Sequence, residues 1–398
     1  ASSTRYNVGC GCSLAHADST RLAMNFRTMN DFNVLMNSLS GNFFPLTEDK
    51  RRPGIGNTIY AIFTWVLNLM YLFSTTIGLV FHAPAMEALQ KGGTTAIICI
   101  EMLSLSAYLN SQREHLRNLI RRVNSILIES DDLERCVRDI VEPHKERLKL
   151  YTIAAVGSIV VWAGMPIIKV LDNDRFTYND YTLPSYVPGA PFTPRVFVLS
   201  VIVQTVGSSY IMLKKIGIDV YMSYFIILLT AEYRYVQKRM TAAFGERNER
   251  LVIDALKECV QHHCNIMETG EMLVDILSVN IGLTYLNCIG RFCFLAFSVI
   301  TLPGAYVAKF LTVMFALGSL MQVYMLCSCI QELLESTSVA DDAFHEDWYG
   351  QGPIVRNIFR TVGLASRIEC RLTAFRIVDL TVPTFATVKS EFLCHSYR

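Results

Sequence analysis

One short stretch of the chain carries four side chains of types that bind metal ions, namely Cys259, His262, His263 and Cys264. Thiolates and imidazoles ligate zinc, but structural zinc sites usually combine two separated pairs of ligands. On a helix, Cys259, His262 and His263 would share one face, and Cys264 would point away. We therefore interpret the two histidines as helix-surface residues beside buried thiols, and we expect neither a metal site nor a cofactor.

Glu101 also stands out, because it lies inside an apolar segment long enough to enter a membrane. A charged side chain there costs about 3 kcal/mol on insertion scales, so it normally faces protein or a wet cavity. Three interpretations stay open: a polar anchor in a ligand pocket, a structural partner for a neighbouring helix, or a neutral protonated acid. The apolar segments also contain Ser, Thr, Tyr and Met, which suits a small apolar ligand but equally ordinary helix packing. No pattern of catalytic residues stands out, and we do not expect an enzyme.

The composition indicates that these residues are positioned by membrane-spanning helices. Of the 398 residues, 52% are hydrophobic and 18% are charged, whereas a soluble protein carries about a quarter charged residues. The apolar residues gather in blocks of about 20, the length that crosses a membrane as a helix. We predict an all-α protein with seven transmembrane helices, at residues 59–81, 94–109, 151–171, 196 to about 213, 276–300, 305–330 and 377 to about 394.

The region after the fourth predicted span is ambiguous. A second apolar stretch at residues 216–229 follows Lys214 and Lys215 almost at once, and it is too short for a comfortable span. Either it is a separate re-entrant or spanning helix, or the fourth helix continues into the cytosol, and we prefer the continuation. Residues 111–129 and 246–275 carry apolar residues at helical spacing, which is typical of helices that pack on other helices. We expect them to build a cytoplasmic helical anchor bundle.

Lys and Arg residues gather in alternate loops, with nine of them between the second and third predicted spans. Cytoplasmic loops are enriched in these residues. The bias predicts a cytoplasmic N-terminus and an extracellular C-terminus, opposite to a G-protein-coupled receptor. The outer loop at residues 172–195 holds three tyrosines and four prolines, and these predict a stiff, irregular cap.

The C-terminal part of the chain resembles the signature end of the insect odorant receptors. From Leu333 it reads LLESTSVADDAFHEDWYG, followed by IFRTVGLASR and LTAFRIVDLTVPTFATVK. Upstream, GIDVYMSYFIILLTAEYRYVQKRM and CVQHHCNIMETGEML are similar to the helices that flank the family's second cytoplasmic loop. The residues at the signature positions are Ser338, Ala343, Phe344, Trp348, Tyr349, Thr384 and Phe385.

The resemblance implies an odorant-gated, non-selective cation channel in the plasma membrane of sensory-neuron dendrites. In such channels an odour-tuning subunit assembles with a shared co-receptor subunit as a hetero-tetramer. The subunits meet through a cytoplasmic anchor, and the seventh span lines the pore, here with Val388 and Phe392 as candidates. The co-receptor has a longer second cytoplasmic loop than this chain, so the resemblance implies an odour-tuning subunit.

The family's ligand lies in the outer half of the helix bundle, among the second, third, fourth and sixth spans. Aromatic edges and one polar group in that region would fit a small volatile ring or ester. By depth in the predicted spans, the candidate ligand-binding residues are Ile98, Glu101, Ser158, Trp162, Met165, Phe197, Val201, Tyr306 and Phe310.

These expectations divide the chain into six parts. Residues 1–58 form a cytoplasmic N-terminal segment, and residues 59–213 hold the first four spans with the ligand-binding outer half. Residues 214–275 form a cytoplasmic helical extension, 276–330 the fifth and sixth spans, 331–376 a cytoplasmic anchor helix, and 377–398 the pore-lining span. Besides the co-receptor and a small volatile odorant, we expect contact with membrane lipid and none with nucleic acid, since no basic patch with interleaved aromatics occurs.

Two other functions fit parts of the same pattern. A gustatory-type receptor of the same superfamily would also be a channel, but it would assemble without the co-receptor. A secondary transporter often has two similar halves and broken helices near the membrane midplane, and we see no internal repeat in the sequence.

Overall fold

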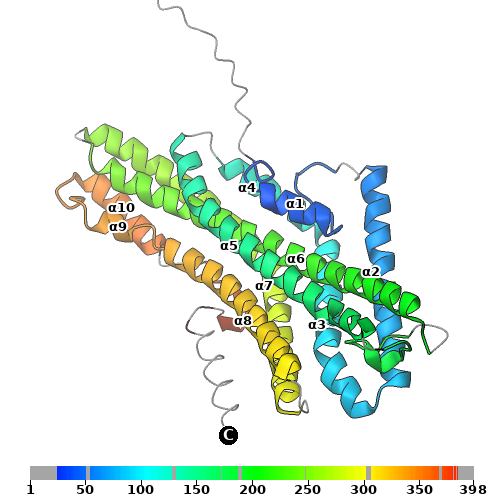
Figure 1. Ribbon diagram of the computed structural model, residues 1–398. Coiled ribbons are helices and arrows are strands. Elements are labelled where there is room, and N and C mark those ends of the chain that lie inside the picture. Colours follow the sequence, from blue (N-terminus) through cyan, green and yellow to red (C-terminus); the bar gives the residue numbers. More distant parts are fainter. Residues whose placement is uncertain are drawn as a thin grey trace, which may run out of the picture.

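The chain forms a bundle of long helices (Figure 1), and the computed structural model describes residues 25–50, 54–127, 131–171, 173–186, 191–246, 248–301, 306–366, 370–379, 381 and 383. The helices are α1 Asp31–Leu39, α2 Ile55–His82, α3 Ala85–Ser111, α4 Arg113–Ile126, α5 Asp131–Gly164, α6 Pro194–Ala243, α7 Glu249–Thr301, α8 Tyr306–Ser336, α9 Asp341–Phe344 and α10 Pro353–Ala365. Two short 3-10 helices, η1 Met165–Leu171 and η2 Tyr178–Asp180, and two short strands, β1 Thr373–Ala374 and β2 Val378–Asp379, complete the described elements.

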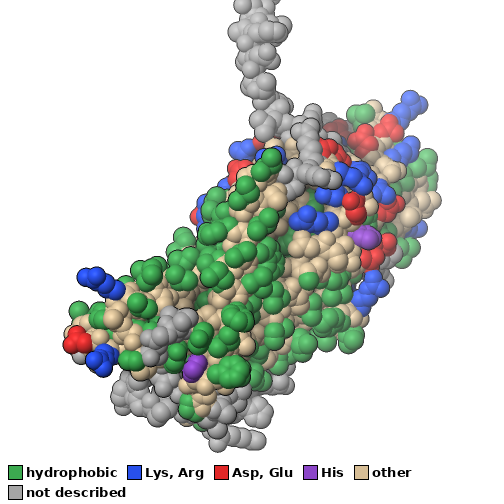
Figure 2. Space-filling view, turned by 90° about the vertical axis from the view of Figure 1, so that its right-hand side faces the viewer, with side chains coloured by type: hydrophobic (Ala, Val, Ile, Leu, Met, Phe, Trp, Pro, Cys, Tyr) green, Lys and Arg blue, Asp and Glu red, His purple; other side chains and the backbone are tan. Residues whose placement is uncertain are grey.

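The described part of the chain holds six helices long and apolar enough to cross a membrane, on α2, α3, α5, α6, α7 and α8. Large apolar side chains such as Phe73, Ile153 and Leu199 lie exposed on their outer faces. Figure 2 shows a broad hydrophobic face, with charged side chains gathered toward its ends. An apolar face of this extent fits a membrane, so the fold is that of a multi-pass membrane protein.

Helices α6 and α7 are longer than any membrane is thick. They have 50 and 53 residues, which corresponds to about 75 Å or more at the rise of an α-helix. A helix needs only about 20 residues to cross the hydrocarbon core. The apolar stretch at residues 216–229 belongs to the unbroken helix α6, as we preferred, and is almost entirely buried among neighbouring helices.

The N-terminal segment packs against the middle of α6. The ring of Phe26 stacks on that of Phe225 with centroids 4.4 Å apart. The side-chain amide of Asn42 donates to the carbonyl of Lys214 at 2.9 Å. Gly217 leaves room for this segment, since a Cβ there would lie 2.9 Å from the hydroxyl of Ser40. Residues 25–50 are therefore a structural part of the bundle.

The amphipathic stretch predicted at residues 111–129 forms α4, after a short break at Gln112. Its apolar side chains occur at helical spacing and all face inward, while Arg117 and Arg121 bind carboxylates on the other face. Burial of one apolar face accounts for the position of this helix. The buried side chains are Leu116, Leu119, Ile120, Val123 and Ile126.

The third predicted span, at residues 151–171, lies within a longer helical segment that ends at Leu171, as predicted, but begins earlier and changes helix type after Gly164. Helix α5 begins at Asp131 and ends at Gly164, where η1 takes over. Pro166 has no N–H to donate to the carbonyl of Trp162 four residues earlier. The hydroxyl of Thr182 donates to that carbonyl instead, at 3.1 Å. The proline thus changes the helix type and leaves a carbonyl that holds the outer loop.

The prediction that a helix begins at residue 377 is wrong. Residues 373–379 form an antiparallel hairpin in which Thr373 pairs with Asp379 and Ala374 pairs with Val378. The two residues at its tip, Phe375 and Arg376, have left-handed φ angles of 51° and 60°, which a helix does not allow. Most of the remaining predicted span, including Val388 and Phe392, lies outside the described residues.

Candidate functional site

The outer loop and the start of α6 share a buried group of aromatic residues, which we name the cap cluster. The rings of Phe176 and Phe197 stack with centroids 4.1 Å apart, and the ring of Tyr181 lies 4.9 Å from that of Phe197. The hydroxyl of Tyr181 forms a hydrogen bond with that of Ser200 on α6. The members of the cap cluster are Phe176, Tyr181, Phe192, Phe197 and Val201.

The loop that carries the cap cluster is held by polar contacts as well. The amide of Thr177 donates to the carboxylate of Asp180 at 2.8 Å, and the ammonium of Lys169 lies 3.3 Å from the same carboxylate. Partial burial raises the pKa of Asp180, but these contacts outweigh it and hold that pKa below its usual value. The loop is therefore a defined cap, as its tyrosines and prolines predict.

A second apolar group lies where α2, α3, α6 and the outer loop meet, and we name it the inner cluster. Gly207 permits the close approach of α2 and α6, since a Cβ at that position would lie 2.9 Å from Tyr71. Trp162 of α5 and Phe315 of α8 pack against the group and are half-buried. The members of the inner cluster are Tyr71, Ile98, Cys99, Met102, Leu183 and Ile211.

The two clusters contain three of the nine candidate ligand-binding residues, and a fourth, Trp162, packs against the inner cluster. Ile98 and Trp162 meet at the inner cluster, and Phe197 and Val201 belong to the cap cluster. Ser158 and Met165 are half-buried, while Phe310 is exposed on α8. The side chain of Tyr306 lies outside the described ones, and Glu101 belongs to a different site.

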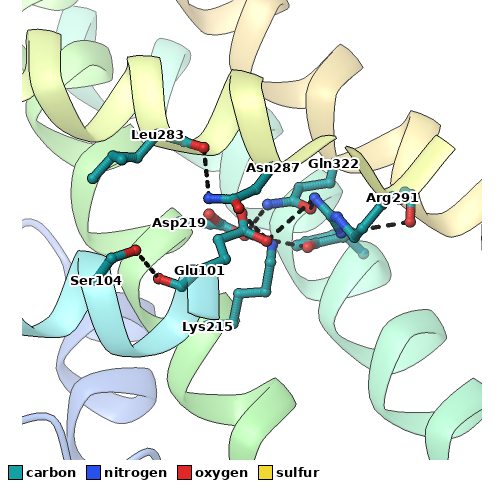
Figure 3. A network of polar contacts seen from close by, with 10 residues as sticks. Glu101, Ser104, Lys215, Asp219, Leu283, Asn287, Arg291 and Gln322 are labelled. Atoms are coloured by element: carbon teal, nitrogen blue, oxygen red, sulfur yellow. Dashed lines mark hydrogen bonds and ion pairs between the residues drawn. The ribbon is translucent and has the colours of Figure 1, made fainter. Parts of the chain in front are cut away.

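That different site is a network of buried charges (Figure 3). The carboxylate of Glu101 lies 3.4 Å from the ammonium of Lys215 and 3.5 Å from the guanidinium of Arg291. Lys215 also lies 3.4 Å from the carboxylate of Asp219, one turn further along α6. Two acids and two bases thus balance one another in the interior.

Neutral side chains join the charges into one unit. The side-chain amide of Gln322 on α8 donates to Asp219 at 2.9 Å and accepts from Arg291 at 2.9 Å. The hydroxyl of Tyr151 on α5 donates to Asp219 at 3.3 Å. The network therefore ties together α3, α5, α6, α7 and α8, and four of these helices, α3, α5, α6 and α8, also contribute residues to the inner cluster or pack against it.

The network lies one helical turn from the inner cluster on two helices. On α3, Glu101 follows Ile98 by three residues, and on α6, Lys215 follows Ile211 by four. Residues three or four apart share a helix face. The ion pairs of Glu101 favour its interpretation as a structural partner for neighbouring helices. Because Glu101 lies so close to the inner cluster, a movement of the residues in that cluster would also move Glu101.

Sequence reasoning missed Lys215, Asp219, Arg291 and Gln322 as members of a site. The sequence did contain a signal for Arg291, because this residue lies inside the predicted fifth span. Placing its charge in the membrane costs as much free energy as placing that of Glu101 there. Lys215 and Asp219 lay in the ambiguous stretch after the fourth span, where no depth could be assigned. Gln322 carries no charge, and its sequence context gave no signal.

The histidine and cysteine group on α7 differs from its interpretation in two respects, the burial of both histidines and the exposure of the Cys264 thiol. His262 and His263 are buried rather than on the surface, because α6 covers this face of α7. The ring of His262 forms a hydrogen bond with the carboxylate of Glu232 at 2.9 Å. Cys259 is buried and Cys264 is exposed. Among the described residues, no group of three potential metal ligands comes together.

A helical bundle with a broad apolar outer surface and six helices long enough to cross a membrane in its described part defines a multi-pass membrane protein. Residues 83–391 match the family model described as 7tm Odorant receptor. The chain belongs to this odorant receptor family, whose members are multi-pass membrane proteins of sensory neurons.

Individual relatives are distant in sequence but similar in fold. The chain is 19% identical to Odorant receptor 13a of Drosophila melanogaster over 258 residues, which are 60% of this chain and 62% of that protein. It is 26% identical to Odorant receptor 67a of the same organism over 148 residues, 37% of this chain and 35% of that protein. The chain thus spans less than two thirds of the length of both relatives.

The fold is similar to that of the insect olfactory receptor OR5 from Machilis hrabei in complex with eugenol. The two structures superpose with a TM-score of 0.77 over 94% of this chain and 97% of that chain, at 14% sequence identity. The all-α architecture predicted from the sequence is therefore confirmed.

Proposed function

We propose that this chain is the odour-tuning subunit of an odorant-gated, non-selective cation channel. The observation that carries the proposal is the pair of buried apolar clusters, of which the cap cluster is mainly aromatic, within a bundle of the odorant receptor family. Apolar walls with a few polar groups suit a small volatile molecule with an aromatic ring or an ester. The related receptor from Machilis hrabei, which was solved with eugenol, supports this chemical class.

The ligand would bind among the candidate residues of the outer half of the bundle. Ile98 and Trp162 would contact it at the inner cluster, and Phe197 and Val201 would close the site from the cap. The other proposed contacts lie further out and are Ser158, Met165, Tyr306 and Phe310. Glu101 would act through its ion pairs. Because the described clusters are well packed, ligand entry must separate side chains, and the ligand would stabilise the separated arrangement.

The proposed channel contains the co-receptor as partner and has its N-terminus in the cytosol. Large apolar side chains that lie exposed around α9 and α10 support an interface in the proposed anchor. A subunit interface would remove them from water, which favours assembly. These side chains are Phe344, Tyr349, Ile354 and Leu364. We also propose that the segment after the hairpin, residues 380–398, lines the pore, with Val388 and Phe392 among the pore-facing positions.

Whole-cell current during a volatile panel would test the proposal. The chain is expressed alone and with the co-receptor, and the panel contains esters, terpenoid alcohols and phenylpropenes such as eugenol. We expect odour-evoked cation current only from the pair. Surface biotinylation shows that both chains reach the membrane.

Each other outcome has a definite meaning. Current from this chain alone would replace the proposal by a gustatory-type receptor channel. Substrate accumulation in vesicles without current would indicate a transporter. Silence of the pair across the panel, with both chains at the surface, would contradict the proposal.

A further inference from the structure

The hairpin at residues 373–379 holds an unfavourable backbone conformation. Its tip closes with a hydrogen bond from the amide of Ile377 to the carbonyl of Ala374 at 2.9 Å. Both central residues, Phe375 and Arg376, have positive φ angles of 51° and 60°. Turns of this type normally use Gly, Asn or Asp, because other side chains are strained there. Contacts outside the hairpin must therefore maintain it.

These contacts come from one face of α7. The amide of Phe375 donates to the carbonyl of Ser278 at 3.1 Å, and the hydroxyl of Ser278 donates to the carbonyl of Thr373 at 3.0 Å. The guanidinium of Arg376 binds the carboxylate of Asp275. The spacing of Asp275 and Ser278 places both on one side of the helix, so the hairpin is attached along α7.

The ring of Phe375 packs against α7 at Gly282, where the helix has no side chain. A Cβ on Gly282 would lie 2.6 Å from two ring atoms of Phe375, a distance that real Cβ atoms do not show. Only glycine at this position allows the ring to lie where it does. The ring and the hydrogen bonds to Ser278 together fix the hairpin against α7.

The same helix reaches the buried charge network. Arg291 follows Gly282 by nine residues on unbroken α7, a distance of about 13 Å along the helix axis. Arg291 is paired with Glu101, which lies one turn from Ile98 of the inner cluster. One rigid helix therefore contacts the ligand-side network at one point and the hairpin at another.

We propose that Phe375 is a positioning residue that couples the proposed ligand site to the last span. Seated over Gly282, it makes the hairpin move with α7, so that a displacement of α7 by the network reaches the segment after Asp379. This inference rests on the proposed channel function. Phe375 thus acts in the opening of the channel, and its substitution should not change which odorant is recognised.

A double-mutant cycle between Gly282 and Phe375 tests the coupling in the full chain with the co-receptor. Gly282→Ala crowds the ring and should lower the current evoked by every active volatile of the panel about tenfold, with unchanged rank order. In the Phe375→Ala background, the same glycine change should have no further effect, because the ring is gone. Gly318→Ala on α8 is the matched control, since a Cβ there meets nothing within 4 Å.

The outcomes separate coupling from plain packing. Loss of surface protein in Gly282→Ala, additive losses in the double variant, or a changed rank order would each overturn the proposal. Hydrogen exchange of the purified complex gives a readout that needs no current. Gly282→Ala should speed exchange of the Phe375 amide at least tenfold, and unchanged exchange would overturn the positioning role. Silence of the unaltered pair would contradict the channel function, while the exchange result would still decide whether Gly282 positions the hairpin.

Discussion

The carboxylate of Glu101 on α3 and the guanidinium of Arg291 on α7 lie 3.5 Å apart, and both side chains are fully buried. A buried ion pair contributes little net stability, but removal of one partner leaves an uncompensated charge. This pair therefore fixes the relative position of two helices that the membrane alone would leave free to slide.

The first prediction concerns single and paired neutralisation of this contact. Glu101→Gln or Arg291→Met should each lower the free energy of unfolding by about 3–5 kcal/mol. Neutralising both residues leaves Lys215 and Asp219 as a balanced pair. The double variant should therefore lose less free energy of unfolding than the sum of the losses in the two single variants. Thermal unfolding of the detergent-purified protein measures this.

An exposed ion pair provides the control for that experiment. Lys149 and Glu146 lie 2.6 Å apart on one helix, with most of the carboxylate in contact with solvent. Glu146→Gln should change stability by less than about 0.5 kcal/mol. Equal losses for the buried and the exposed variants would show that the network does not hold the helices.

Trp162 should affect ligand selectivity rather than folding. Its ring packs half-buried against the inner cluster, so Trp162→Ala enlarges that site without exposing the centre of the bundle. We expect a changed rank order of agonists at unchanged surface level, measured by currents across the volatile panel. Trp348→Ala, at the far end of the bundle, is the comparison variant. A uniform loss of the responses to all agonists, together with loss of surface protein, would show that Trp162 is only a packing residue.

Gly78 should be essential for seating the cap. A Cβ at this position would lie 2.2 Å from the carbonyl oxygen of Pro184, and backbone atoms cannot rotate away. Gly78→Ala should therefore break the hydrogen bonds that join Ser74 and Tyr186. We expect a loss of about 1–3 kcal/mol in local stability, measured as faster proteolysis within residues 173–186. Gly157→Ala, with nothing within 4 Å, should leave proteolysis unchanged.

Asp180 should make the stability of the cap depend on pH. Its pKa is lower in the folded loop than in an unfolded chain, through the Thr177 amide and Lys169. Such a group contributes stability above its unfolded pKa, about 3.9, and loses it as the pH falls through the folded value. Hydrogen exchange of the loop should therefore be constant from pH 7 to 5, after correction for the intrinsic rate, and rise in stronger acid. The acid-induced rise should be absent in Asp180→Asn and retained in Asp174→Asn.

The sequence alone predicted the six spans that the described part of the chain contains, favoured a continuous α6 and indicated the unusual position of Glu101. Hydropathy and helical spacing are local properties of the chain. They decide where helices cross the membrane, because burial of apolar surface in the membrane drives the placement of those helices. The same local reasoning was correct that Cys264 points away from Cys259, since helix geometry alone sets that relation.

Tertiary structure alone decided which of these residues meet. Glu101 and Arg291 are far apart in sequence, and their pairing depends on how α3 packs on α7. His262 became buried because α6 covers it. Residues 377–379 became part of a hairpin rather than a helix because Ser278 and Gly282 hold Phe375 in a left-handed conformation. Long-range packing can thus impose a backbone that local propensity disfavours, because the contacts it gains outweigh the local strain.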